Sequence, residues 1–208
     1  MPDSLTLPAT AFAGHRLIAQ GALAEVALAV KAWEARGAAG PVVTLDDRTG
    51  AVIDLDLRGS EAEIVARLAQ AAGQAAGKGP AQADAAKPGP GRPRLGVVAR
   101  EVTLLPRHWD WLAAQRGGAS SALRRLVEEA IRTDGGRSAS RAAQEACYRA
   151  CTTLAGDLAG YEEAMRALFR SDGRAFARHT GRWPKDVRGY ARRLAARAGL
   201  APAAAAAG

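Results

Sequence analysis

The chain of 208 residues has little cysteine, little lysine and no long hydrophobic run. Its only cysteines are Cys147 and Cys151, which excludes a disulfide-rich scaffold and a four-cysteine zinc module. No apolar stretch reaches the roughly 18 residues that a membrane span needs. Residues 1–13 lack the basic and apolar regions of a secretory signal. We therefore expect a cytoplasmic protein with no membrane partner.

Basic charge is what the sequence has in excess, and most of it is arginine. There are 29 Lys and Arg residues against 21 Asp and Glu residues, a net charge of +8 with a pI near 10.3. Residues 1–75 hold 6 basic and 9 acidic side chains, residues 76–135 hold 10 and 6, and residues 136–208 hold 13 and 6. A positive field in the C-terminal two-thirds is expected if that part binds a polyanion. The composition of a GC-rich genome is the alternative source of this bias.

Strand and helix signals alternate near the N-terminus, so we predict a small α/β domain over residues 10–74. Strands are predicted over residues 12–19, 41–45 and 51–57, and a helix over residues 22–36, where apolar residues recur at helical spacing. The polar loop 46–50 ends in glycine, as hairpin loops do. Ser60 and Glu63 have capping-box spacing, which predicts a second helix. The resulting β-α-β-β-α unit is large enough for an independent core.

The rest of the chain completes an α+β protein. Residues 75–94 are rich in Ala, Gly, Pro and Lys and predict a flexible linker. Residues 95–134 predict a module made of a strand (97–105), a helix (107–115), a turn, and a helix capped by Ser120. This module cannot bury its own apolar face, so it must pair with a second copy or dock on the remaining chain. Residues 137–199 predict a helical region, with helices over 140–155, 161–169 and 174–179 and one started by Pro184 after the anchor Trp183. Residues 200–208 predict a disordered tail.

The middle module resembles the ribbon-helix-helix proteins among bacterial repressors and antitoxins. The resemblance rests on residues 102–106 before the first helix, 117–121 at the turn and 123–127 in the second helix. It implies a homodimer in which two strands pair into a ribbon that enters the major groove of duplex DNA. It also implies that the start of the second helix holds a phosphate, because its first N–H groups lack internal partners. Ser120 and Ser121 are then the expected phosphate contacts.

Two registers of the predicted strand stay open for base readout. Counting back from Pro106, one register presents Arg100 with Val102 and Leu104, and the other presents Thr103 with Glu101 and Leu105. Arg100 and Thr103 are the side chains that could read a base edge. The alternative is a helical pair packed on the C-terminal helices, in which Arg124 with Glu128, and Arg125 with Glu129, form exposed ion pairs.

Residues 90–94 resemble the AT-hook, whose Arg-Gly-Arg-Pro core lies in the minor groove, although Pro90 replaces the first arginine. The resemblance implies that Arg92 and Arg94 add contacts to DNA phosphates. The alternative is the end of a linker that carries two solvated arginines.

Asp46, Asp47, Asp54 and Asp56 are candidate ligands of a divalent cation. Asp54-Leu55-Asp56 superficially matches metal-nucleotide transferase motifs, but no phosphate-binding glycine loop accompanies it. We expect these residues to form the solvent-exposed face and the turn of a hairpin, and we expect the protein to bind no metal and no cofactor. The two cysteines lie four apart on a predicted helix and are expected to be small buried residues. The three histidines are scattered and support no catalytic triad.

The whole chain also resembles a bacterial family known as domain of unknown function 2239, on residues 10–17, 91–109 and 183–188. That resemblance implies no activity. From the residues we expect a non-enzymatic, dimeric, DNA-binding transcriptional regulator, whose arginine-rich C-terminal helices add phosphate contacts. Its N-terminal unit would bind a protein partner or a ligand. The alternative is a protein-interaction adaptor that uses the middle module only to dimerise. A metal-dependent enzyme built on Asp54 and Asp56 is a third hypothesis.

Overall fold

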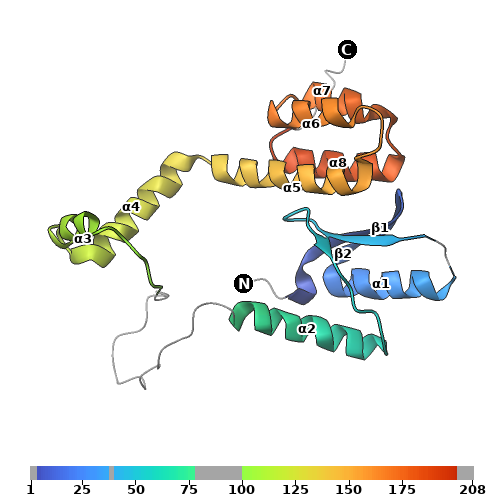
Figure 1. Ribbon diagram of the computed structural model, residues 1–208, viewed down its shortest axis with the longest axis horizontal. Coiled ribbons are helices and arrows are strands. Elements are labelled where there is room, and N and C mark those ends of the chain that lie inside the picture. Colours follow the sequence, from blue (N-terminus) through green and yellow to red (C-terminus); the bar gives the residue numbers. More distant parts are fainter. Residues whose placement is uncertain (1–3, 38–39, 78–99, 201–208) are drawn as a thin grey trace, which may run out of the picture. The chain divides into compact units, whose positions relative to one another are not determined.

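A computed structural model describes residues 4–37, 40–77 and 100–200. It divides the chain into two compact units, one made of Met1–Gly79 with Ser138–Gly208 and the other of Pro80–Arg137. The fold is mixed α+β, with an antiparallel sheet near the N-terminus and helices elsewhere (Figure 1). The sequence predicts the N-terminal and C-terminal regions as separate domains, whereas in the structure they share one unit.

The sheet has four strands in the order β2-β1-β3-β4, and every neighbouring pair is antiparallel. Its strands are β1 (Pro8–Ala13), β2 (Arg16–Ala22), β3 (Val42–Asp46) and β4 (Val52–Ile53). The prediction of one strand over residues 12–19 is wrong, because the chain turns back between β1 and β2. Gly14 lies in that turn with a φ of 54°, a conformation that favours glycine. The unit therefore begins β-β-α-β-β-α instead of β-α-β-β-α.

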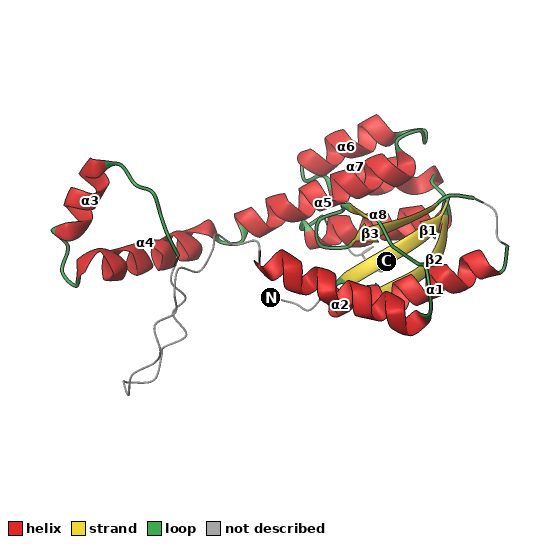
Figure 2. Ribbon diagram, turned by 60° about the horizontal axis from the view of Figure 1, so that its bottom comes forward, coloured by secondary structure: helices red, strands yellow, loops and turns green. Residues whose placement is uncertain are grey.

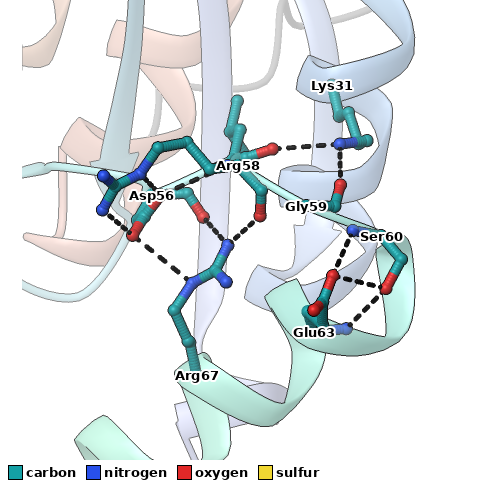
Figure 3. Close-up of polar contacts among 8 residues, drawn as sticks. Lys31, Asp56, Arg58, Gly59, Ser60, Glu63 and Arg67 are labelled. Atoms are coloured by element: carbon teal, nitrogen blue, oxygen red, sulfur yellow. Dashed lines mark hydrogen bonds and ion pairs between the residues drawn. The ribbon is translucent and has the colours of Figure 1, made fainter.

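The strand predicted over residues 51–57 is also shorter than expected. Only Val52 and Ile53 pair with β3, and residues 54–58 form no strand. The predicted alternation nevertheless holds, since Ile53, Leu55 and Leu57 are partly buried while Asp54 and Asp56 are exposed. The Lys31 ammonium group donates to the carbonyls of Leu57 (3.0 Å) and Gly59 (2.5 Å), so side-chain contacts hold this segment in place of a strand ladder (Figure 3).

Two helices cover one face of the sheet. They are α1 (Leu23–Ala35) and α2 (Glu61–Gly77). Leu23, Val26 and Val30 of α1 pack with the small β1 residues Ala9 and Ala11. The predicted capping box at the start of α2 is confirmed: the Ser60 N–H donates to Glu63 Oε2 (2.6 Å), and the Glu63 N–H donates to Ser60 Oγ (3.3 Å). Figure 3 shows this reciprocal pair.

Four helices lie on the opposite side of the sheet, so the sheet lies between two groups of helices (Figure 1). They are α5 (Arg137–Ala155), α6 (Tyr161–Phe169), α7 (Gly173–His179) and α8 (Lys185–Arg197), and a short 3-10 helix, η2 (Thr180–Arg182), follows α7. Of these, α5 and α8 lie nearer to the sheet, and α6 and α7 lie beyond them. Phe12 and Leu45 of the sheet are fully buried in the core that these helices form. The N-terminal segment therefore packs on the C-terminal helices and shares a hydrophobic core with them.

Individual predictions for this helical region are confirmed. Trp183 is buried and donates its indole N–H to the Ala159 carbonyl (3.1 Å), which anchors the chain where Pro184 caps α8. Cys147 and Cys151 are free and buried. The Cys147 contact and burial raise the pKa of the Cys151 thiol, so it stays protonated and unreactive near neutral pH.

The second unit contains α3 (Pro106–Ala113) and α4 (Gly118–Asp134), and its residues are described from Arg100 onward. Of the strand predicted over residues 97–105, residues 100–105 form no strand and residues 97–99 lie outside the described residues. Residues 75–77 of the predicted linker belong to α2, which extends to Gly77. Residues 78–94 of that linker and residues 201–208 of the predicted tail lie outside the described residues. No described helix combines the length and the apolar character that crossing a membrane requires.

Candidate nucleic-acid interface

The turn between α3 and α4 places Ser120 and Ser121 at the start of a helix. Gly117 caps α4 in the left-handed conformation (φ 85°), and α4 begins at Gly118. The prediction that Ser120 is the N-cap is therefore wrong, since two glycines turn the chain before it. Ser120 is exposed and Ser121 half-buried, and both lie in the first turn, where backbone N–H groups have no partner within the helix.

The two arginines after this turn are exposed. The ion pairs expected between Arg124 and Glu128, and between Arg125 and Glu129, do not form; instead Glu129 pairs with Arg132. Among the residues that the structure describes, Arg124 and Arg125 have no carboxylate within ion-pair distance. Their guanidinium groups are therefore available to an anion near the start of α4.

The segment before α3 carries the predicted base readers. Arg100 and Thr103 are both exposed, and Leu105 leads into α3 in an extended conformation (φ −67°, ψ 150°). Val102 and Leu105 are each 51% exposed, so neither register of the predicted strand has a buried face in a single chain. Arg92 and Arg94, the other predicted phosphate contacts, lie outside the described residues.

An apolar surface covers this second unit. Only Leu112 and Ala122 are buried between residues 100 and 137, a stretch that the structure describes throughout. Seven large apolar side chains are exposed there: Val102 (51%), Leu105 (51%), Trp109 (42%), Trp111 (50%), Leu126 (45%), Val127 (55%) and Ile131 (69%). We call these seven residues the apolar face. Two buried residues against seven exposed large apolar side chains is an unusual balance for a folded unit, and exposed apolar surface of this extent commonly marks a site that binds a partner.

Three of the four candidate metal ligands, Asp46, Asp47 and Asp56, have other partners, and the fourth, Asp54, is exposed. The Asp47 carboxylate is buried and accepts hydrogen bonds from Thr10 Oγ1 (2.8 Å) and Tyr190 Oη (2.9 Å). Asp46 Oδ1 accepts from the backbone N–H of Arg48 (2.7 Å). In the described residues no group of three or more Asp, Glu, His or Cys side chains is arranged to hold a metal ion.

Asp56 lies between two arginines (Figure 3). Arg58 donates to both of its carboxylate oxygens, Nε to Oδ1 at 2.9 Å and Nη2 to Oδ2 at 2.7 Å, and Arg67 Nε lies 3.4 Å from Oδ2. The Arg58 hydrogen bond holds the pKa of Asp56 well below its usual range. A hollow of about 420 Å³ lies beside this group, lined by Glu34 and residues 55–58. Both guanidinium groups compete with any cation for this carboxylate, so the geometry favours a structural ion pair over a metal ligand.

Two features of the structure were not anticipated residue by residue. One is the bridge from Asp47 to Tyr190, whose members are 143 residues apart and share no sequence signal. The other is the arrangement of the C-terminal arginines, for which the sequence predicts phosphate contacts without naming residues. The four-residue spacing of Arg174, Arg178 and Arg182 is a signal that could have identified it.

Comparison with known proteins gives one match. A family described as "Uncharacterized protein conserved in bacteria" (DUF2239) matches residues 8–195. No curated protein and no solved structure matches the chain. The resemblance of residues 94–132 to ribbon-helix-helix proteins stays a prediction.

Proposed function

The chain belongs to the DUF2239 family of uncharacterised bacterial proteins, and we propose that it is a dimeric DNA-binding regulator without catalytic activity. The observation that carries this proposal is the apolar face. Burying one large apolar side chain contributes about 1.5–3 kcal/mol, so leaving seven in water is a considerable cost for a unit of this size. A partner that covers them removes that cost.

A second copy of the chain is the partner that the geometry favours. Among the described residues, those from Arg100 to Leu104 make no backbone hydrogen bond, so their N–H and C=O groups are available to a second strand. A segment can pair antiparallel with its own copy about a two-fold axis, which also brings two identical apolar faces together. The ribbon-helix-helix resemblance supports the same arrangement.

The start of α4 supports DNA as the ligand of such a dimer. A helix N-terminus is electropositive and presents free N–H groups, and here two hydroxyls and two unpaired arginines lie within its first two turns. Ser120 and Ser121 would donate to a phosphate, while Arg100 and Thr103 would face bases in the groove. Arg92 and Arg94 would add phosphate contacts from the segment upstream. Without DNA binding, the same dimer would serve a protein-interaction adaptor.

Oligomeric state tests the first half of this proposal. We expect sedimentation equilibrium to give twice the chain mass of 21.6 kDa. The double variant Val127→Gln and Ile131→Gln should be monomeric with its fold intact, because both side chains are exposed in the single chain. The control Glu128→Gln and Glu129→Gln introduces the same side chains at two exposed positions of α4 that are not part of the apolar face. A monomeric wild type, or equal effects of the two double variants, would refute the interface.

DNA affinity tests the second half. We expect Ser120→Ala with Ser121→Ala to weaken binding to every duplex by a similar factor, because phosphate contacts carry no sequence information. Thr133→Ala is the control, since it removes an exposed hydroxyl from the last turn of the same helix. Unchanged affinity in the double serine variant would remove the phosphate assignment. A dimer that recovers no DNA would support the adaptor alternative.

A further inference from the structure

The C-terminal helices concentrate positive charge that the chain does not neutralise. Between residues 170 and 197 there are nine basic residues and two acidic ones. Both carboxylates bind backbone N–H groups and not basic side chains. Asp172 Oδ1 accepts from the Ala175 N–H at the start of α7 (2.9 Å), and Asp186 Oδ2 accepts from the Leu17 N–H (2.9 Å). Within the described part of the chain, no basic residue of this stretch has a carboxylate within 4 Å.

Two hydrogen bonds join arginines of α8 to α7 and η2. Arg188 of α8 donates to the Gly181 carbonyl (2.6 Å), and Arg192 donates to the Ala177 carbonyl (2.8 Å). These two bonds fix α8 along α7 and η2, so the two helices lie on the same side of the sheet (Figure 2). We call the group the basic seam; it consists of Arg174, Arg178, Arg182, Lys185, Arg188 and Arg192.

The exposed members of the seam are arranged along a surface. Arg174 and Arg178 are one helical turn apart on α7, about 6 Å along its axis, and Arg182, four residues further along the chain, ends the 3-10 helix η2. All three are exposed. Like charges one turn apart destabilise a helix by a few tenths of a kcal/mol per pair, and among the described residues no carboxylate pairs with these arginines. A polyanion would relieve it.

The surroundings of the seam favour a phosphate backbone over a membrane. Basic helices that lie on a bilayer also expose large apolar side chains that insert between lipids. Across residues 170–197, all of them described, no large apolar side chain is exposed; Phe169, at the end of α6, is 54% exposed, but its ring lies against that of Tyr148. Arginine binds phosphate with a planar pair of donors, and five of the six seam residues are arginines.

We propose that the basic seam of α7, η2 and α8 is a second DNA-binding surface, which holds the phosphate backbone of duplex DNA without reading its sequence. This inference rests on the proposed DNA-binding function but uses no residue of the α3–α4 unit. In this arrangement the α3–α4 unit dimerises and recognises the DNA sequence, and the basic seam adds an electrostatic contribution to affinity that depends on salt concentration.

The test is the salt dependence of binding to a short fluorescein-labelled duplex of mixed sequence. The seam variant combines Arg174→Gln, Arg178→Gln and Arg182→Gln, which removes three exposed charges. The control combines Arg48→Gln, Arg149→Gln and Arg166→Gln, whose guanidinium groups pair with Asp46, Glu145 and Glu163. Both variants lose the same net charge, and circular dichroism verifies that both are folded.

Each phosphate contact contributes about 0.9 to the slope of log K against log salt. We therefore expect the slope of the seam variant to be smaller by about 3, and the slope of the control to equal that of the wild type. Equal slopes in all three proteins, equal losses in the seam and control variants, or a wild type that binds no duplex would overturn the proposal. Stronger competition by unlabelled single-stranded RNA than by unlabelled duplex would overturn the assignment to duplex DNA.

The outcomes separate this inference from the proposed function. In the monomeric variant Val127→Gln with Ile131→Gln, weak binding should persist and should be removed by the seam substitutions. If the α3–α4 substitutions change neither mass nor affinity while the seam substitutions reduce the slope, the regulator proposal fails and the seam stands. If only the α3–α4 substitutions matter, the seam fails and the regulator proposal stands.

Discussion

Replacing Asp47 should destabilise the unit that contains the sheet more than replacing any exposed aspartate. The Asp47 carboxylate accepts hydrogen bonds from Thr10 and Tyr190, whose residues are 0% and 2% exposed. Asp47→Ala leaves both hydroxyls buried without this acceptor. A buried polar group that loses its partner costs about 1–3 kcal/mol, so the two together should cost about 2–6 kcal/mol.

Urea titration followed by circular dichroism measures this loss of free energy of unfolding. Asp54→Ala is the matched control, because Asp54 is exposed beside the same sheet and should change stability by less than about 0.5 kcal/mol. At roughly 2–4 °C per kcal/mol for a unit of this size, the melting temperature of Asp47→Ala should fall by about 4–24 °C.

A double-mutant cycle isolates the bond between Asp47 and Tyr190. Because Tyr190→Phe removes one of the hydroxyls that Asp47→Ala would strand, the double variant should lose about 1 kcal/mol less than the sum of the single losses. Additive losses, or a loss in Asp47→Ala no larger than in Asp54→Ala, would refute the bridge between α8 and the turn that follows β3.

Three further predictions concern the same unit. Gly50→Ala should lower the free energy of unfolding by about 2–5 kcal/mol, because its Cβ would lie 2.0 Å from the Ala146 carbonyl oxygen at a φ of +67°. The control Gly14→Ala, at a φ of +54° with nothing within 4 Å of the added Cβ, should lower it by only about 1–2 kcal/mol. Similar urea midpoints for the two variants would contradict this prediction. Burial, and then the Asp47 charge, raise the pKa of Tyr190 in the folded protein, so its contribution to stability is complete below about pH 10 and is lost at higher pH. The free energy of unfolding of the wild type should therefore fall more steeply at alkaline pH than that of Tyr190→Phe. Parallel pH profiles of the two proteins would contradict this prediction. Trp183→Phe removes the donor to the Ala159 carbonyl and should cost about 1–3 kcal/mol, whereas a melting temperature within 1 °C of the wild type by calorimetry would show that the indole does not anchor α8.

Local signals in the sequence predict helices well. The capping box of Ser60 and Glu63, the proline before α8 and the apolar spacing of α1 each locate a helix, because each depends on residues within one or two turns. Strands are predicted less well, since a strand is defined by its partner. Residues 54–57 alternate like a strand, yet their backbone has no neighbour to pair with.

The error at the first strand has a similar origin. Residues 12–19 are apolar enough to suggest one strand, and only the conformation of Gly14 shows that the chain reverses there. That reversal places β1 in the centre of the sheet, with α1 on one face and the C-terminal helices on the other. The shared core follows from contacts such as Phe12 with Tyr190, which are far apart in the sequence and carry no periodic signal.

The sequence predicts the apolar surface of α4, but it does not predict where α4 begins or which residues read the bases. Helical spacing predicts the apolar face of α4, and the structure leaves Leu126, Val127 and Ile131 exposed as an unpaired module would. The start of α4 moved from Ser120 to Gly118, because the left-handed Gly117 ends the preceding turn. The choice between Arg100 and Thr103 as readers depends on strand pairing between two chains, which a single chain does not contain.

Sequencing of sheared genomic DNA recovered by the purified protein near physiological salt tests the central claim most directly. A dimeric regulator predicts enrichment of a two-fold-symmetric motif, and predicts that the variant Val127→Gln with Ile131→Gln loses that enrichment. Flat coverage of the genome, or no recovery of DNA, would contradict the claim.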